Sequence, residues 1–285
     1  MKLNDIYNKY KPLFSEKNIP EIALRTLLSH IFNFENIAEF EFNREKDFEL
    51  KKKDIKLLND VLSGIPVQYV INESYFYNMV FYVNKHVLIP RPETEELVFE
   101  SLKKINEKFI SSGDKLVIAD VGCGSGNISL SIDKNLSLPH KVIGIDNSIL
   151  ALYVSWKNNV KLKGKCKFLY GNLLDPLKWR NVKLDVIVSN PPYVSKLDEI
   201  DDNVKKYEPM SAIVANPSYK HYKDMLLNYK ILLKSKFLIC FEIGYDQKET
   251  LENILKNDFF YRNFSKYEFK KDMEGKDRFL FVESI

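Results

Sequence analysis

The stretch Asn190-Pro191-Pro192-Tyr193 places a polar amide, two prolines and an aromatic ring directly after a mainly apolar run, residues 186–189. Valine and isoleucine in so short a run favour a buried strand. Each proline lacks an N–H and restricts the residue before it to extended backbone, so the chain turns rigidly here. Because ligands of open α/β sheets bind beyond the carboxyl ends of strands, we expect Asn190 to bind another amide or an amine.

A second candidate site is the glycine loop, residues 120–126, which follows a predicted strand at 116–121. Its glycines stand at alternate positions, where they allow a sharp turn and close approach of a ligand to the backbone. Asp146 ends the next predicted strand, twenty residues beyond Gly126, and can accept hydrogen bonds from ribose hydroxyls. These features alone fit a dinucleotide enzyme equally well.

Two details favour the methyl donor S-adenosyl-L-methionine over a dinucleotide. Asn127 stands where the G-x-G-x-x-G pattern has its third glycine. Asp120 lies two positions before the first glycine, where a carboxylate would repel a pyrophosphate and attract the donor's ammonium group. Nucleotide binding and a purely structural turn remain alternatives. The predicted donor-binding residues come from four strand ends: Asp120, Gly122, Cys123, Gly124, Ser125, Gly126, Asp146, Asn172, Leu173 and Asn190.

Asn172 and Leu173 follow the third predicted strand, at a point that would face the adenine of the donor. The Asn172 side chain could bind the exocyclic amine, and Leu173 could offer a backbone N–H. Capping of the following turn is the alternative for both residues.

The elements that must position these residues alternate between short apolar strands and helical stretches. Such alternation predicts a parallel sheet with helices on both faces. We expect strands at 116–121, 142–146, 167–170, 186–189 and 237–241, helices at 127–135, 148–162, 218–234 and 247–256, and a closing hairpin at 267–282.

The N-terminal part of the chain follows a helical period instead, with helices ending before Gly64 and Pro66. Aromatic and β-branched residues at 74–88 then predict a β-hairpin, followed by a proline-stiffened segment and a helix for which Thr94 is a candidate N-cap. We therefore expect a helical N-terminal substrate-recognition domain at 1–73, a hairpin linker at 74–89 and an α/β domain at 90–285.

Composition sets broad limits on the class of protein. The chain has 285 residues, a net charge of +4 and three widely spaced cysteines, which argues against a disulfide framework and a structural zinc site. Without a visible signal peptide or a long apolar span, we expect a cytoplasmic protein with no membrane partner. Four scattered histidines suggest surface or structural roles and no metal site: His30, His86, His140 and His221.

Taken together, these motifs resemble the release factor glutamine methyltransferases, a family of class I S-adenosylmethionine-dependent methyltransferases. The resemblance spans about residues 20 to 283 and includes several further motifs, namely Pro66-Val67-Gln68-Tyr69, Ile89-Pro90-Arg91-Pro92-Glu93-Thr94, Tyr207-Glu208-Pro209, Phe241-Glu242-Ile243-Gly244 and Gly275-Lys276-Asp277-Arg278. It implies a Rossmann-like, mostly parallel seven-stranded sheet. It also implies S-adenosyl-L-methionine as donor, S-adenosyl-L-homocysteine as product, and the glutamine of the Gly-Gly-Gln motif of class I peptide chain release factors as methyl acceptor.

On this reading the tetrad binds the substrate glutamine. The Asn190 side-chain oxygen and the Pro191 carbonyl would accept the two amide hydrogens, while Tyr193 would pack over the side chain and exclude water. Pro192 completes the predicted substrate-binding residues. The main rival is an adenine-amino methyltransferase acting on DNA or RNA, which would use the same tetrad but should show a strongly basic face. A charge of +4 supports that rival weakly, and we expect a monomer without a stable nucleic-acid partner. A non-catalytic binding module of the same fold is a further alternative.

Overall fold

The computed structural model describes residues 1–35, 37–111, 113–197 and 200–285. The chain forms two compact units. The first contains Met1–Glu73 together with Asp202–Tyr207, and the second contains Ser74–Asp201 and Glu208–Ile285. The hairpin that was expected to be a linker is thus part of the second unit from Ser74 onward. Asp202–Tyr207, from the range expected to be α/β, belongs to the first.

The first unit is helical, as its apolar period predicts. Its helices are α1 (Leu3–Glu16), α2 (Glu21–Phe32), α3 (Ile37–Phe42), α4 (Lys52–Leu62), α5 (Val67–Ile71) and α10 (Asp202–Tyr207). Apolar side chains of α1, α2 and α4 form its core, among them Leu3, Phe14, Leu27 and Leu58. Helix α4 ends before Gly64, whose φ of +97° is a conformation that favours glycine. The short helices α3 and α5 were not predicted, because five or six residues carry too little periodicity.

The predicted hairpin is confirmed as β1 (Glu73–Phe76) and β2 (Met79–Tyr82). Between them, Tyr77 and Asn78 both have positive φ, which is the geometry of a type I′ turn.

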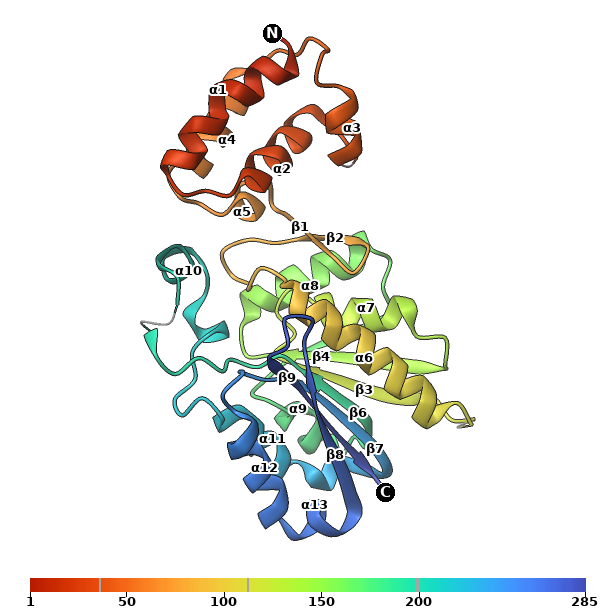
Figure 1. Cartoon of the computed structure of the whole chain (residues 1–285). Coiled ribbons are helices and arrows are strands. Elements are labelled where there is room, and N and C mark those ends of the chain that lie inside the picture. The colour runs from red at the N-terminus through yellow and green to blue at the C-terminus, as the bar shows by residue number, and fades with distance from the viewer. Residues whose placement is uncertain (36, 112, 198–199) are drawn as a thin grey trace. The chain divides into compact units, whose positions relative to one another are not determined.

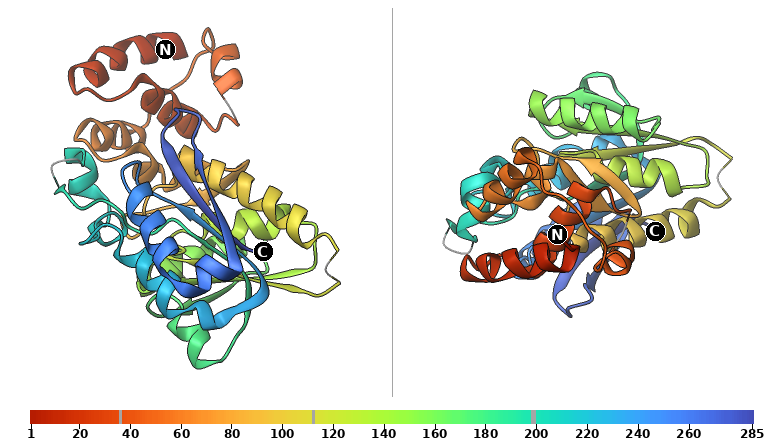
Figure 2. Two further views of the ribbon diagram at one scale, coloured as in Figure 1. Left: turned by 60° about the horizontal axis from the view of Figure 1, so that its bottom comes forward. Right: turned by 90° about the horizontal axis from the view of Figure 1, so that it is seen from above.

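The second unit contains a seven-stranded sheet in the order β5-β4-β3-β6-β7-β9-β8. Its first five strands are parallel, and β9 is antiparallel to both β7 and β8. Figure 2 shows the two long C-terminal strands side by side. This confirms the expected mostly parallel sheet closed by a hairpin. The strands are β3 (Leu116–Val121), β4 (His140–Asp146), β5 (Lys167–Tyr170), β6 (Leu184–Ser189), β7 (Leu233–Glu242), β8 (Ser265–Lys271) and β9 (Asp277–Ser284).

Helices cover both faces of this sheet, as the alternation predicts. In Figure 1, α6, α7 and α8 lie on one face and α9, α11, α12 and α13 on the other. Two expectations need correction. Thr94 is inside α6, which starts at Pro92. The helix expected at 218–234 is α11, which ends at Asn228; a short 3-10 helix, Lys230–Leu232, follows it before β7 begins at Leu233. The helices are α6 (Pro92–Phe109), α7 (Asn127–Asn135), α8 (Ile149–Lys161), α9 (Asp175–Trp179), α11 (Lys220–Asn228), α12 (Lys248–Asn257) and α13 (Phe259–Phe264).

The strand order brings the predicted motifs to one edge of the sheet. Strand β3 lies between β4 and β6, and Val121 is paired with both Ile145 and Ser189. The residues that follow these strands therefore emerge next to one another at the carboxyl ends, where open α/β sheets bind ligands. Within the described ranges, none of the helices has the length and apolar character needed to cross a membrane.

Candidate functional site

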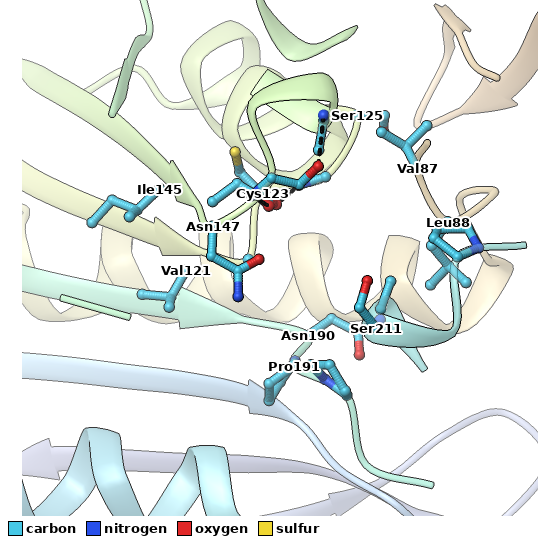
Figure 3. A pocket seen from close by; sticks show the side chains of 18 of the residues that line it. Val87, Leu88, Val121, Cys123, Ser125, Ile145, Asn147, Asn190, Pro191 and Ser211 are labelled. Atoms are coloured by element: carbon cyan, nitrogen blue, oxygen red, sulfur yellow. Dashed lines mark hydrogen bonds between the residues drawn. The ribbon is translucent and has the colours of Figure 1, made fainter. Parts of the chain in front are cut away.

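A pocket opens at the carboxyl ends of β3, β4, β5 and β6, entirely within the second unit, and holds about 1040 Å³ including the part open to solvent. In Figure 3, Cys123 and Ser125 of the glycine loop lie across the pocket from Asn190 and Pro191. Concave sites at the carboxyl ends of parallel strands are where open α/β sheets bind small ligands. Of the predicted site residues it is lined by Gly122, Cys123, Gly124, Ser125, Asp146, Asn172, Leu173, Asn190, Pro191 and Pro192.

The glycine loop turns toward this space with positive φ at Gly122 (+73°) and Gly124 (+52°). A Cβ at either position would meet no atom of the described structure within 4 Å, so the side-chain position of both glycines is open. The loop is anchored by the N–H groups of Gly122 and Cys123, which donate to the Ile145 carbonyl at 2.8 and 3.0 Å. The backbone is thus held fixed while the space above the glycines is left for a ligand.

Asp146 connects the glycine loop to the start of α8. Its Oδ2 accepts from the Gly124 N–H at 2.9 Å and its Oδ1 from the Ser148 N–H at 2.8 Å. Burial raises the pKa of this carboxyl, against the effect of these hydrogen bonds. Each oxygen keeps a second lone pair, so the carboxylate can also accept ribose hydroxyls. These observations fit a bound nucleoside.

Asp120 and Gly126 were predicted to bind the donor, but neither lines the pocket. Asp120 is fully buried, and its Oδ2 accepts from the Ser129 N–H at 2.9 Å and the Ser129 hydroxyl at 2.6 Å in the first turns of α7. Burial raises its pKa to about 7. A Cβ on Gly126 would lie 3.1 Å from the Ser155 Cβ and 3.3 Å from Phe168, and its φ is +78°, so tight packing and the left-handed backbone both favour glycine here. Both residues support the loop from within the protein.

Gly171, Asn172 and Leu173 follow β5 and line the pocket. The Gly171 N–H donates to the Asp146 carbonyl at 3.0 Å, and the Asn172 carbonyl accepts from the Asp175 N–H at 3.0 Å. This segment therefore lies beside the backbone of Asp146, at the end of β4. Contact between Asn172 or Leu173 and an adenine stays a prediction.

The tetrad emerges from β6, and its Asn190 is linked to two residues distant in sequence. Asn190 Nδ2 donates to Thr94 Oγ1 at 3.0 Å, and the Thr94 hydroxyl donates to Glu242 Oε2 at 2.7 Å. The Tyr193 hydroxyl donates to the other carboxylate oxygen, Oε1, at 3.3 Å. Tyr193 packs against the sheet core rather than lining the pocket. Its ring thus supports the tetrad, and its predicted contact with a substrate side chain stays a prediction.

Glu242, at the end of β7, is 2% exposed. Burial raises its pKa to about 7, while the Thr94 hydrogen bond, the nearby Arg278 guanidinium and Tyr193 favour the ionised form. The Glu93 carboxylate acts in the opposite direction. A carboxyl group with such a pKa beside the tetrad is typical of functional sites. Glu242 was noted in the sequence only within a motif shared with the family, and its link to Asn190 was not foreseen.

A second buried carboxylate joins two walls of the pocket. Glu208 Oε2 accepts from the Ile89 N–H at 3.0 Å, and Oε1 pairs with Arg91 Nη2 at 2.6 Å. Arg91 and Pro209 both line the pocket. The family-like motifs around Ile89 and Glu208 are therefore joined by this interaction.

Two histidines expected to be structural or on the surface, His86 and His221, also line the pocket. Burial lowers the pKa of His221, which favours its neutral form. Neither residue belongs to a motif, so the sequence carried no signal for this placement.

The hairpin β1–β2 is fixed to the glycine loop by the buried Asn158 of α8. Its Nδ2 donates to the carbonyls of Tyr82 and Ser125, both at 2.9 Å, and its Oδ1 accepts from the Tyr82 N–H at 2.7 Å. One side chain thus satisfies three backbone groups and joins β2, α8 and the loop.

Comparison with known proteins agrees with this geometry. The Methyltransferase small domain family matches residues 100–208. The release factor glutamine methyltransferase of Bacillus subtilis (strain 168) is 38% identical over 219 residues, covering 75% of this chain and 74% of the relative. That of Bacillus cereus is 34% identical over 278 residues, covering 94% of each chain.

The fold also matches solved structures. The crystal structure of the hMettl16 catalytic domain in complex with a MAT2A 3′UTR hairpin has a TM-score of 0.53 at 12% identity, covering 84% of this chain and 83% of that one. At this identity the match shows the fold alone. The identity and coverage of the bacterial relatives show more: the chain belongs to the release factor glutamine methyltransferase family.

Proposed function

We propose that this protein transfers a methyl group from S-adenosyl-L-methionine to the side-chain amide nitrogen of the glutamine in the Gly-Gly-Gln motif of class I peptide chain release factors. One observation of the site carries the proposal most strongly. Asn190 Nδ2 donates to Thr94, and with the amide held in this orientation its oxygen is the acceptor that the side chain offers to a ligand at a strand end beside the glycine loop. An acceptor in that position suits a substrate that presents N–H groups.

The glycine loop and Asp146 would hold the donor. Gly122 and Gly124 leave room above the backbone, and Asp146 offers free acceptor lone pairs to the ribose. Asn172 and Leu173 would border the adenine. When bound, S-adenosyl-L-methionine supplies an electrophilic methyl group on its sulfonium.

The tetrad would align the weak nucleophile. A carboxamide nitrogen is poorly nucleophilic because its lone pair is delocalised into the carbonyl, so orientation is the main contribution that the protein can make. Asn190 Oδ1 and the Pro191 carbonyl would accept the two amide hydrogens, turn the nitrogen toward the methyl group and stabilise positive charge that develops on it. Such positioning can contribute about 7–11 kcal/mol to lowering the barrier. No base is needed beforehand, because the proton becomes acidic only as the N–C bond forms.

The helical unit would recognise the body of the release factor, while the second unit carries the chemistry. The apolar core of α1, α2 and α4 makes it a stable module that can present a fixed surface. We propose this role for residues 1–73, together with a cytoplasmic location and a monomeric state.

The proposal is tested by incubating the purified protein with a purified class I release factor and isotopically labelled donor, followed by peptide mass mapping. The expected result is one added methyl group on the Gly-Gly-Gln glutamine. A parallel reaction with total RNA and DNA tests the adenine-amino alternative. Label on nucleic acid, with none on the release factor, would overturn the proposal.

A further inference from the structure

We propose that Glu242, acting through Thr94, is a positioning residue that keeps the Asn190 amide oriented with its oxygen toward the substrate. The inference rests on the proposed function, because the orientation of an acceptor matters only for a substrate that presents N–H groups. It assigns a task to two residues outside the tetrad, of which Thr94 lines the pocket and Glu242 does not.

The direction of the hydrogen bonds follows from a count of hydrogens. An ionised carboxylate can only accept, so the single hydrogen of the Thr94 hydroxyl is directed to Glu242 Oε2, 2.7 Å away. Thr94 Oγ1 then has only lone pairs for its other neighbour, which lies at 3.0 Å. That neighbour must be a donor, and the only donor in the Asn190 side chain is the NH₂ group of its amide. The carboxylate thus selects one of the two orientations of the Asn190 amide.

The opposite orientation carries a clear penalty. A flipped Asn190 would set its oxygen against the lone pairs of Thr94 Oγ1, so this contact would be repulsive. Thr94 and Glu242 are both 2% exposed, so bulk water has little access to this contact. The flipped amide would also present its NH₂ group to the pocket, where it would oppose the N–H groups of a substrate amide.

The same carboxylate also holds the other polar side chain of the tetrad. Glu242 Oε1 accepts from the Tyr193 hydroxyl at 3.3 Å, so one side chain fixes both ends of the tetrad. The charged and titratable groups that face it are Arg278 on β9, Glu93 on α6 and Tyr193. Arg278 is itself held by Asp272 Oδ2 at 3.0 Å. Arg278 and the hydrogen bonds from Thr94 and Tyr193 favour the ionised carboxylate that the hydrogen count requires, whereas burial and Glu93 oppose it.

Protonation of Glu242 would remove this selection. A neutral carboxyl group can donate to Thr94 Oγ1, which frees the threonine hydrogen to turn toward Asn190. The amide can then flip, with its oxygen toward Thr94 and its NH₂ group toward the pocket. Methyl transfer should therefore need the ionised form of Glu242.

The test compares T94V, which removes the hydroxyl at nearly constant volume, with T94S, which keeps it. Rates of release-factor methylation and donor affinity by calorimetry are measured for both, for E242Q and for T94V/E242Q. We expect T94V to lower kcat/KM for the release factor about tenfold, with donor affinity changed by less than about threefold. T94S should stay within about threefold of the wild type.

Two further readouts separate positioning from general structural support. Because the effect of Glu242 on Asn190 passes through Thr94, the loss in T94V/E242Q should be smaller than the product of the two single losses; the loss that E242Q still causes in the T94V background reflects its second contact, with Tyr193. The wild-type kcat/KM should also rise with pH through about 7, and that rise should be absent in E242Q. The E242Q profile tests the idea even if T94V fails to fold.

The outcomes that refute this inference differ from those that refute the proposed function. T94V at near wild-type activity, T94S as slow as T94V, fully multiplicative losses in T94V/E242Q, or the same pH profile in wild type and E242Q would each overturn it. A wild-type protein that does not methylate the release factor at all would instead overturn the function on which it rests.

Discussion

Replacing Glu242 by glutamine should change how the stability of the second unit depends on pH. Burial raises the folded-state pKa of Glu242 from 4.5 to about 7. Between these values the folded protein binds a proton that the unfolded chain releases. The stability from this group is therefore fully present below pH 4.5 and is lost as the pH rises to 7. Glutamine does not titrate, so E242Q should lack that loss.

The magnitude follows from the size of the shift. At 1.36 kcal/mol for each pH unit, the wild type should lose about 2 to 3 kcal/mol relative to E242Q between pH 5 and pH 8. Asp120 has a raised pKa for the same reason, but it is present in both proteins and its contribution cancels. The comparison therefore isolates Glu242.

Amide hydrogen exchange at β7 is a suitable assay, because its residues Leu238–Phe241 pair with strands on both sides and should exchange mainly on unfolding of the unit. At one pH the intrinsic exchange rates of the two proteins are nearly equal, so the ratio of their exchange rates reports the stability difference. That ratio should change by roughly 30- to 150-fold between pH 5 and pH 8. A change of less than about twofold would show that Glu242 is ionised in the folded state with an ordinary pKa, and would refute the reasoning.

Three further predictions concern the parts that hold the site. Asn158→Ala removes three hydrogen bonds to backbone groups and should destabilise the second unit by about 3 kcal/mol in urea unfolding; a loss below about 1 kcal/mol would contradict the role of this side chain. Asp146→Ala should weaken donor binding in calorimetry by about 10- to 100-fold, and unchanged affinity would exclude the ribose contact. Gly126→Ala should lower the free energy of unfolding by about 2 to 3 kcal/mol, because backbone strain at φ +78° adds to a 3.1 Å contact with Ser155. Gly275→Ala has similar strain, at φ +82°, but open space for the new Cβ, so it should lower the free energy of unfolding by only about 1 kcal/mol. Equal losses in the two variants would contradict the packing argument.

The sheet and its strand ends could be predicted because their signals are local. Short apolar runs such as 116–121 and 167–170 coincide with β3 and β5, and the glycine spacing marks the loop after β3. Polar residues at the ends of parallel strands then had to gather at one edge. The pocket lining at Asp146, Asn172 and Asn190 follows from topology alone.

The supporting hydrogen bonds could not be predicted, because they join residues far apart in the chain. Thr94 and Glu242 are separated by 148 positions, and no local pattern links them. The Asp120 carboxylate was expected to line the pocket. It instead accepts a hydrogen bond from the Ser129 N–H in the first turn of α7, where backbone N–H groups have no partner within the helix. The sequence did not show that this turn would lie next to Asp120. The hydrogen bond between the Tyr193 hydroxyl and the buried Glu242 was likewise not foreseen, because it joins residues 49 positions apart. Side-chain direction at a strand end is decided by tertiary partners.

The measurement that tests the account most directly is single-turnover methylation of a class I release factor by wild type and Asn190→Ala, with donor affinity measured on the same samples. Asn190 lines the pocket, but its assigned task is to orient the substrate amide. The account predicts that N190A lowers the methylation rate by about 100-fold or more, while donor affinity stays within about threefold of the wild type. Methylation by N190A at a near wild-type rate would contradict the account.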